Sequence, residues 1–381
     1  MTAQAAPTIV DDAVQPQRAA MLAMGTANPL NCMPQDEYAD WYFRVTRSDH
    51  LINLKENMKK ICRNSGIKKR YFHHSEETFR RHPEPAVRDQ PSLDDILATA
   101  VPELAAAVAL RAIDECGRPA SDITHLVFTT YSGMHMPGAD LRLASLLGLP
   151  SSVKRTSMYF HGCSAAVAAL RVAKDLAENN PGARVLVASA ELTLILFRAP
   201  QEDHIDELVT QALLSDGAGA VIVGAGGADE GPLFEMVSAA QTTLPNSEDG
   251  ADGQLYASGM VFCPSAKLPA LVRENVEQCF VEGVGPLVPS GGGSNDLFWA
   301  VHPGGLAILD SVEGGLALAP GKLDASRHVL SEYGNMSGTS IIFVLDELRR
   351  RGDLQPGGLG VMLGIGPGIT METMLLRVAA A

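Results

Sequence analysis

Residues 158–178 read MYFHGCSAAVAALRVAKDLAE, and this stretch is the strongest indication of the fold. Its apolar start predicts a strand that ends at Gly162, and the Ala-rich residues after Cys163 have a high helix propensity. Cys163 is therefore predicted at a helix entrance, where free backbone N–H groups and the helix dipole favour a thiolate. Such a cysteine is a candidate nucleophile, although a free cysteine is more often a small buried core residue.

The order of strand, glycine turn and helix recurs along the chain. Matching strands are predicted in an early and a late region, at 125–130, 184–188 and 218–223 and at 297–301, 360–364 and 374–378. The first strand of each set leads into a helix, over 139–147 and 306–316 respectively. Near-continuous apolar strands alternating with helices indicate buried sheets covered on their faces. The chain is thus predicted to be an α/β protein of two duplicated halves joined near 224–231.

The remaining N-terminal sequence predicts covering elements. A strand is expected over 21–25, helices over 35–47, 51–66 and 96–116, and a polar, proline-containing stretch lies at 76–93. A chain of 381 residues exceeds the usual size of one hydrophobic core. One large layered domain or two fused halves is therefore expected.

Charge and cysteine usage exclude several classes of protein. The net charge of −14 argues against nucleic acid and anionic membrane as partners, since both need a basic surface. No secretory signal and no apolar run long enough for a membrane span is expected. Six widely spaced cysteines indicate a reducing, intracellular compartment. No metal site is expected either, because the adjacent His73 and His74 point apart.

Two further residues complete a possible catalytic set with Cys163. His302 follows a predicted buried strand, at the kind of position where active sites of α/β sheets gather. Asn335 lies in a glycine-containing turn, and its ordinary role there would be a turn or helix cap. Cys, His and Asn in this order also describe papain-like proteases. The central position of Cys163, without the protease signature around it, argues against that class.

The chain resembles the chalcone synthase and stilbene synthase superfamily from about Arg18 to Arg377. The matching motifs are Gly25-Thr-Ala-Asn-Pro29, Asp36-Glu-Tyr, Tyr42-Phe-Arg-Val-Thr46, Met136-Pro-Gly-Ala-Asp140, Ala173-Lys-Asp-Leu-Ala-Glu-Asn-Asn180, Ala300 through Gly305, Tyr333-Gly-Asn-Met-Ser337 and Gly366-Pro-Gly368. A biosynthetic thiolase is excluded, because its second active cysteine is missing from the loop Gly364-Ile-Gly-Pro-Gly368.

The resemblance implies a five-layered αβαβα thiolase fold, with residues 18–228 carrying the cysteine and 229–381 carrying the histidine and asparagine. It implies a homodimeric type III polyketide synthase that condenses malonyl-CoA with a starter acyl-CoA and keeps no permanent cofactor. Cys163 would carry the acyl chain as a thioester, with His302 holding it as the thiolate. His302 and Asn335 would then stabilise the enolate left by decarboxylation and the oxyanion of each acyl transfer.

The resemblance also implies a substrate pocket, which departs from the family at several positions. Its expected lining and gate residues are Tyr131, Ser132, Met136, Glu191, Thr193, Leu196, Leu214, Gly253, Phe262, Ser337 and Pro367. Met136 matches a residue that reaches into the partner's cavity, and Phe262 matches one of two gate phenylalanines. Leu214 replaces the second gate phenylalanine, while Tyr131 and Leu196 add bulk where a coumaroyl group would lie. We expect a medium or long aliphatic starter, as in grass alkylresorcinol and alkylresorcylic acid synthases.

Alternatives remain open for the chemistry that follows. The substitutions could be neutral repacking in a stilbene, chalcone or curcuminoid type of synthase with an aromatic starter. Ser132, Glu191 and Ser337 match a network for aldol closure in stilbene-forming relatives, although Tyr131 replaces its threonine. An aldol-type alkylresorcinol or alkylresorcylic acid is therefore expected, with a lactone by-product as an alternative. A silent scaffold protein is a further option, against which the intact catalytic set argues.

The remaining expectations concern the residues that contact coenzyme A and the location of the protein in the cell. The coenzyme A contacts are expected at Lys55, Lys60, Arg63 and Ala307, with Asn57 and Asn64 in place of two lysines of the family. Cytoplasmic residence is expected, with association at the endoplasmic reticulum surface through partners as an option.

Overall fold

The computed structural model describes residues 18–82, 91–225, 230–256, 259–289 and 292–380. Its centre is a nine-stranded sheet in the order β11-β12-β13-β8-β1-β7-β6-β4-β5. The strands are β1 (Ala19–Ala27), β4 (His125–Thr130), β5 (Lys154–Tyr159), β6 (Arg184–Glu191), β7 (Gly217–Ala225), β8 (Phe234–Thr243), β11 (Phe298–Val301), β12 (Leu359–Gly366) and β13 (Thr370–Val378). The predicted junction of the halves falls partly on residues 226–229, outside the described residues.

The sheet consists of two parts that share one pairing scheme. In the N-terminal part, β4 pairs with β6 in parallel and β6 pairs with β7 antiparallel. In the C-terminal part, β11 pairs with β12 in parallel and β12 pairs with β13 antiparallel. Among the described residues, two residue pairs between β1 and β8 join the two parts into one sheet. The duplication predicted from the sequence is therefore confirmed.

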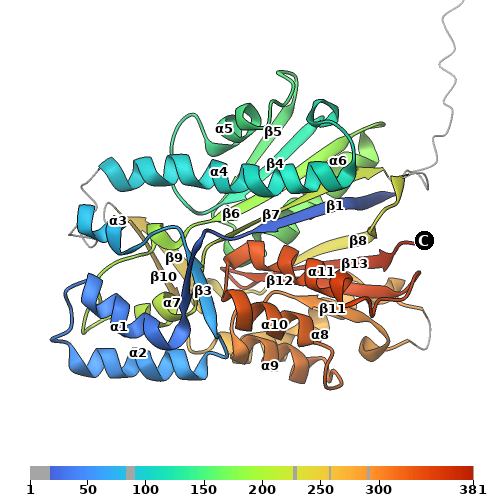
Figure 1. Cartoon of the computed structure of the whole chain (residues 1–381). Helices are drawn as coiled ribbons and strands as arrows, with labels where there is room; N and C mark the ends of the chain where they lie inside the picture. Colours follow the sequence, from blue (N-terminus) through green and yellow to red (C-terminus); the bar gives the residue numbers. More distant parts are fainter. Residues whose placement is uncertain (1–17, 83–90, 226–229, 257–258, 290–291, 381) are drawn as a thin grey trace, which may run out of the picture.

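Three hydrophobic clusters divide the molecule into five layers. On β4, Leu126 and Phe128 join the cluster of α4 (Pro91–Cys116), whereas Val127 points to the opposite face. There it meets α6 (Ala165–Asn179) and α11 (Ser340–Arg351), which also contact the C-terminal strands. The far face of those strands packs on α8 (Leu268–Gly283) and α9 (Leu306–Gly315). Figure 1 shows α4 along the N-terminal strands and α8 and α9 at the opposite side of the molecule. This is the predicted αβαβα order.

Shorter elements lie around the sheet. They are β2 (Asn31–Pro34), β3 (Lys69–Phe72), β9 (Ala251–Tyr256), β10 (Gly259–Pro264), α1 (Gln35–Val45), α2 (Ile52–Asn64), α3 (Glu76–Arg81), α5 (Ala139–Leu146), α7 (Glu207–Leu213) and α10 (Asp324–Tyr333). Helix α3 lies in the stretch that the sequence marked only as polar. It begins with a capping box between Ser75 and Thr78, which satisfies two free backbone N–H groups.

The helix α4 combines unusual length with an apolar composition. By length and composition alone, its part Asp95–Cys116 is apolar enough to cross a membrane. In this fold, Val101, Val108 and Ala112 are fully buried in the cluster on the outer face of the N-terminal strands. The composition is thus that of a core helix, consistent with the expectation of no membrane span.

A buried arginine ties the surrounding elements to the sheet. Arg70 on β3 is 0% exposed and lies over the ring of Tyr38 at 3.8 Å. Its Nε donates to Oε1 of Gln35 (2.7 Å), and its Nη1 donates to the carbonyl oxygens of Gln211 (2.8 Å) and Leu214 (2.6 Å). Arg70 therefore joins α1 and β3 to the end of α7, where Leu214 lies.

We predict that Arg70→Met lowers the free energy of unfolding by about 2 kcal/mol, because the gain from removing a buried charge is smaller than the loss from three unsatisfied acceptors. Urea unfolding measures this change. The control is Arg142→Met, whose weak pair with Glu103 is exposed and should change stability by less than about 0.5 kcal/mol. An effect of Arg70→Met as small as that of the control would contradict this interpretation.

Candidate active site

Cys163 lies where the two halves of the protein touch. It follows β5 and occupies a short 3-10 turn, Gly162–Ser164, immediately before α6 begins at Ala165. Gly162 has a φ of 57°, and a Cβ atom there would lie 2.6 Å from Cδ of Pro367. Only glycine fits this position, in conformation and in space. The predicted helix entrance is therefore a 3-10 turn that leads into the helix.

The C-terminal half brings His302 and Asn335 to the same place. His302 follows β11, and its backbone N–H donates to the carbonyl oxygen of Leu363 at 2.9 Å. Asn335 follows α10, and its Nδ2 donates to the carbonyl oxygen of Gly304 (3.0 Å) while its Oδ1 accepts from the backbone N–H of Ser337 (2.8 Å). These bonds fix the orientation of the amide side chain. The three predicted catalytic residues thus line one cavity.

Burial governs the charge of both the thiol and the imidazole. It raises the pKa of Cys163 to about 11, and a hydrogen bond from Oγ of Ser337 (3.6 Å to Sγ) opposes this shift only in part. Burial also lowers the pKa of His302 to about 3. Neither ring nitrogen of His302 has a hydrogen-bond partner among the described residues. At neutral pH a charge on either group is therefore disfavoured unless the other group takes the opposite charge.

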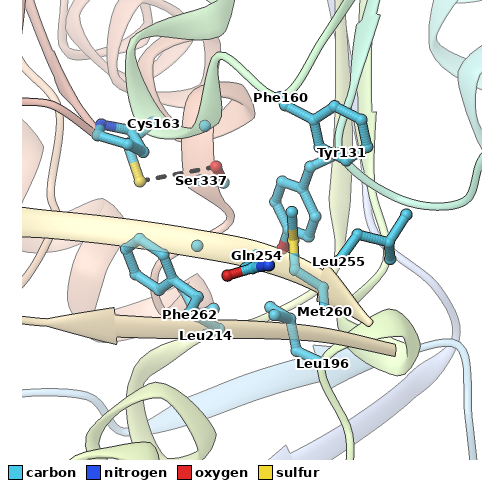
Figure 2. A pocket seen from close by; sticks show the side chains of 13 residues that line it. Tyr131, Phe160, Cys163, Leu196, Leu214, Gln254, Leu255, Met260, Phe262 and Ser337 are labelled. Carbon is cyan, nitrogen blue, oxygen red and sulfur yellow. Dashed lines mark hydrogen bonds between the residues drawn. The ribbon is translucent and has the colours of Figure 1, made fainter. Parts of the chain in front are cut away.

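Two cavities meet at Cys163. The smaller one, about 350 Å³, and the larger one, about 680 Å³, share Cys163, Leu214, Phe262 and Pro367. Figure 2 shows the smaller cavity, with Ser337 bonded to the thiol and a mainly apolar wall. Its lining is Tyr131, Phe160, Gly162, Cys163, Leu196, Leu214, Gly253, Gln254, Leu255, Met260, Phe262, Ser337 and Pro367. A group attached to the thiol can therefore extend into an apolar space.

The larger cavity leads from the thiol to the surface. Besides His302 and Asn335, it is lined by the exposed side chains of Lys60 and Ile205, and by Ala307. A long substrate with a charged end can thus reach Cys163 from the solvent.

Two of the four expected coenzyme A contacts lie away from this cavity. Lys55 is held by Asp40 (2.9 Å) and Asp49 (2.8 Å), and Arg63 lines a separate surface hollow of about 520 Å³ with Lys59. The structure brings together Lys60 and Ala307, but it places Lys55 and Arg63 elsewhere.

Most of the expected pocket residues line the smaller cavity, and four lie outside it. Ser132, Glu191 and Thr193 are buried outside this lining, and the side chain of Met136 is 97% exposed. The sequence interpretation missed Phe160, Gln254, Leu255 and Met260. Alternation along a strand could have found Met260, because it lies two residues before Phe262 on β10 and faces the same side.

Glu191 is the centre of a buried network next to Tyr131. Its Oε2 accepts from the backbone N–H of Tyr131 (2.9 Å), from Oγ of Ser132 (3.0 Å) and from Oγ1 of Thr130 (3.3 Å). Burial raises the pKa of Glu191 to about 8, although these donors oppose the shift. The side chain of Ser337 instead contacts Cys163. Of the residues predicted to take part in ring closure, Ser132 and Glu191 are hydrogen-bonded to each other in the structure, while Ser337 contacts the thiol.

His74 and the metal-ligating residue types offer no further site. His74 is fully buried among Trp41, Phe72, Phe79 and Phe197, and burial lowers its pKa to about 3. Within the described ranges, no group of three or more His, Cys, Asp or Glu residues is placed to hold a metal ion.

An α/β chain of two duplicated halves, with cysteine, histidine and asparagine around a branched apolar cavity, defines an acyl-condensing enzyme of the thiolase fold. The family model for chalcone and stilbene synthases, N-terminal domain, matches residues 10–227, and that for the C-terminal domain matches residues 235–380. A bisdemethoxycurcumin synthase from Oryza sativa subsp. japonica is 55% identical over 370 residues, covering 94% of this chain and 92% of the relative.

The chain therefore belongs to the chalcone and stilbene synthase family. It is a type III polyketide synthase, an acyltransferase whose substrates are coenzyme A thioesters and which uses no permanent cofactor.

We predict that Glu191→Gln changes how stability depends on pH. The pKa of this carboxyl is raised from 4.5 to about 8, so between these values the folded chain holds a proton that the unfolded chain lacks. This contribution to stability is lost as pH rises through that window. The Tm of Glu191→Gln should therefore rise relative to that of the wild type between pH 5 and about pH 9, because glutamine stays neutral.

Thermal unfolding at several pH values measures this difference. The exposed residue Glu274 gives the control variant Glu274→Gln, which should follow the wild type at every pH. A constant difference between Glu191→Gln and the wild type would show that Glu191 does not titrate in this window.

Proposed function

We propose that this polyketide synthase extends a medium or long aliphatic acyl starter with malonyl units on Cys163. The observation that carries the proposal is the smaller cavity, which begins at the thiol and has no charged residue in its described lining. Leu196 and Leu214 supply aliphatic wall where a threonine and a ring were expected from the family. Aliphatic side chains hold a methylene chain by apolar contact, and the chain needs no polar group to bind there.

The catalytic roles follow from the placement of the three residues. Proton transfer from the thiol of Cys163 to His302 creates an ion pair. In this buried site a thiolate is favourable only when it is paired with the imidazolium. The thiolate attacks the starter thioester, the displaced coenzyme A thiolate takes the proton from His302, and coenzyme A leaves through the larger cavity. His302 and the N–H of Asn335 that does not bond Gly304 then donate to the malonyl thioester carbonyl as carbon dioxide departs. The enolate attacks the acyl group on Cys163, and the extended chain returns to the thiol for the next cycle.

An aromatic starter is the second candidate. The rice relative is named a bisdemethoxycurcumin synthase, and its identity of 55% supports related substrates. The apolar lining of the smaller cavity also admits an aromatic ring, which is compatible with this candidate.

We propose aldol closure of the chain to an alkylresorcinol or alkylresorcylic acid. The hydrogen bond between Ser132 and Glu191 supports it, because these residues match the network of stilbene-forming relatives. Ser337 contacts the thiol instead of Glu191, and Tyr131 replaces the threonine. A lactone by-product is therefore expected beside the resorcinol.

Coenzyme A binding and dimer formation complete the proposal. Lys60 and Ala307 are the proposed coenzyme A contacts, since both line the cavity that leads to Cys163. A homodimer is proposed from the exposed Met134, Met136 and Phe160, because large exposed apolar side chains mark association surfaces. Cytoplasmic residence, with recruitment to the endoplasmic reticulum surface through partners, stays a prediction.

We predict that His302→Gln slows alkylation of Cys163 by iodoacetamide at least about 100-fold at pH 7, because burial raises the pKa of the thiol and glutamine cannot take its proton. The rate for this variant should rise about tenfold per pH unit up to pH 10, whereas the wild-type rate should change little between pH 6.5 and 9. Peptide mass spectrometry at Cys163 measures both rates. A wild-type rate that also rises tenfold per unit would refute the ion pair.

We predict that radiolabelled malonyl-CoA yields alkylresorcinols or alkylresorcylic acids from long-chain acyl-CoA starters, and less product from coumaroyl-CoA or acetyl-CoA. Mass spectrometry of the products decides the starter. In Leu196→Trp, the larger side chain should reduce the use of long starters at least about tenfold, because overpacking an apolar site costs about 1 to 3 kcal/mol.

Malonyl-CoA decarboxylation serves as the internal control, because it does not need the smaller cavity. A preference for coumaroyl-CoA would support the aromatic candidate and reject the aliphatic one. No turnover with any starter would support the hypothesis of a silent scaffold protein. Cys163→Ala serves as the inactive reference for that comparison.

A further inference from the structure

The hydroxyl group of Ser337 contacts the thiol from the C-terminal half of the protein. Its Oγ donates a hydrogen bond to Sγ of Cys163 across 3.6 Å, which is the dashed line in Figure 2. Ser337 is 2% exposed, so this bond lies in the protein interior. His302, in contrast, has no hydrogen-bond partner at either ring nitrogen among the described residues. The structure therefore gives the thiol a partner besides the imidazole that is expected to take its proton.

An unusual backbone conformation holds this hydroxyl at the thiol. Ser337 has a φ of 54°, in the left-handed region that residues with a side chain rarely adopt. Its backbone N–H donates to Oδ1 of Asn335 (2.8 Å), and the backbone N–H of Met336 donates to Oγ of Ser340 (2.8 Å). These bonds hold the turn in its conformation. Such a conformation persists only where the surrounding structure imposes it, and residues of this kind cluster at functional sites.

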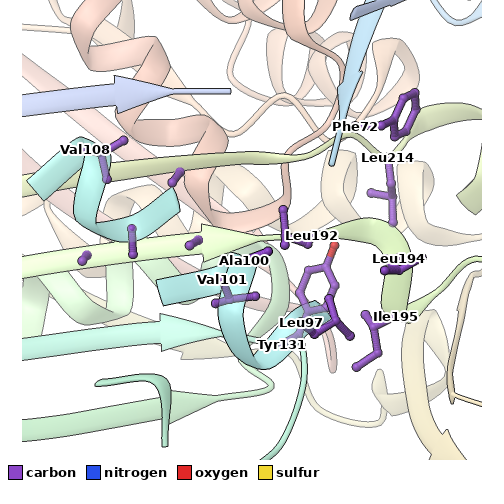
Figure 3. Packing of buried hydrophobic residues seen from close by; sticks show 14 of the residues in the cluster. Phe72, Leu97, Ala100, Val101, Val108, Tyr131, Leu192, Leu194, Ile195 and Leu214 are labelled. Carbon is purple, nitrogen blue, oxygen red and sulfur yellow. The ribbon is translucent and has the colours of Figure 1, made fainter. Parts of the chain in front are cut away.

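The turn that carries Ser337 is also fixed to the N-terminal half. The backbone N–H of Asn335 donates to the carbonyl oxygen of Leu213 (3.0 Å), and the carbonyl oxygen of Asn335 accepts from the N–H of Ser215 (2.9 Å). Leu214, between these two residues, packs in the hydrophobic cluster that Figure 3 shows. The position of the hydroxyl relative to the thiol is therefore set by the core and not by a free loop.

We propose that Ser337 is a catalytic residue whose hydroxyl donates a hydrogen bond to the thiolate of Cys163. The proposal rests on the proposed function of Cys163 as the acyl carrier and adds one group to its machinery. A hydrogen bond to a charged acceptor is stronger than the same bond to a neutral one. The hydroxyl therefore favours the thiolate over the thiol, and it keeps its own proton throughout.

The bond acts at two steps of the catalytic cycle. When His302 takes the thiol proton, the electron pair stays on Sγ of Cys163, and Ser337 stabilises the charge there. Attack on the starter thioester forms a C–S bond to Cys163 and breaks the one to coenzyme A, so the charge leaves Sγ and the hydrogen bond weakens. In the condensation the enolate carbon attacks the acyl carbon, the C–S bond to Cys163 breaks, and the electron pair returns to Sγ. Ser337 then stabilises the departing thiolate.

Three other titratable groups of the described residues influence the thiol or lie beside it, and they set the pH range of a test. His302 lines the same cavity as Cys163 and takes the proton. Tyr131 stays neutral, because burial raises its pKa well above 10. Glu191 raises the pKa of the thiol when it is charged, and burial raises its own pKa to about 8. Below pH 8 the effect of the Ser337 hydroxyl can therefore be measured separately.

The first test follows alkylation of Cys163 by iodoacetamide from pH 4.5 to pH 8 with peptide mass spectrometry, and it needs no substrate. In Ser337→Ala we expect the pH at which the rate reaches half its plateau to rise by about 0.5 to 1 unit. Below that pH the rate should fall about 3- to 10-fold, the effect of one hydrogen bond. Above both pKa values the two rates should converge. A profile that coincides with the wild-type profile would overturn the proposal.

Two further variants separate the hydroxyl from the backbone of the turn. Ser337→Gly also lacks the hydroxyl, but glycine adopts a φ of 54° without strain, so it should show the same shift as Ser337→Ala. Ser340→Ala removes the buried hydroxyl that accepts from Met336 and should keep the wild-type profile. A wild-type profile in Ser337→Gly, or an equal shift in Ser340→Ala, would assign the effect to the turn and reject the proposal.

Starter loading separates this inference from the proposed function. Intact-protein mass spectrometry measures acylation of Cys163 by acyl-CoA at pH 5.5 and pH 8. Ser337→Ala should slow loading about 3- to 10-fold at pH 5.5 and by less at pH 8, because the thiolate fractions converge. No acylation of the wild type by any thioester would reject the proposed function, while the alkylation profile would still decide whether Ser337 stabilises the thiolate. Normal loading with equal alkylation profiles would reject the inference alone.

Discussion

Backbone contact between the two halves is the constraint on which the site depends. A Cβ atom at Gly162 would lie 2.6 Å from Pro367, one at Gly366 would lie 2.4 Å from Oγ of Ser164, and one at Gly338 would lie 2.9 Å from the carbonyl oxygen of Gly162. Side chains at these positions would force the turn before α6 away from the β12–β13 hairpin. The glycines therefore let a cysteine from one half share a cavity with a histidine and an asparagine from the other.

This close contact also explains the electrostatics. His302 is buried and Cys163 half-buried between two packed half-sheets, so an isolated charge is costly on either the thiol or the imidazole. The same burial strengthens the hydrogen bonds that orient Asn335. Burial thus strengthens the hydrogen bonds at the site and also requires its charges to be paired. The pKa of Cys163 has to be interpreted together with that of His302.

Sequence periodicity predicted the elements that obey it. β4 and α9 were found to within one or two residues, because their apolar patterns have periods that belong to buried strands and helices. The coenzyme A contacts were harder, since α2 carries basic residues on two faces. Lys60 and Asn64, four residues apart, face the larger cavity, whereas Lys59 and Arg63 share the other hollow. Phe160 escaped prediction because its φ of 62° is a local backbone feature with no signal in the pattern.

Substrate choice depends on a few side chains that the fold leaves free to vary. One methylene in an apolar pocket changes binding by only about 1 to 3 kcal/mol, so Leu196 and Leu214 can grade chain length but cannot reject a near relative outright. We therefore expect the wall to grade starters by chain length rather than to select a single one.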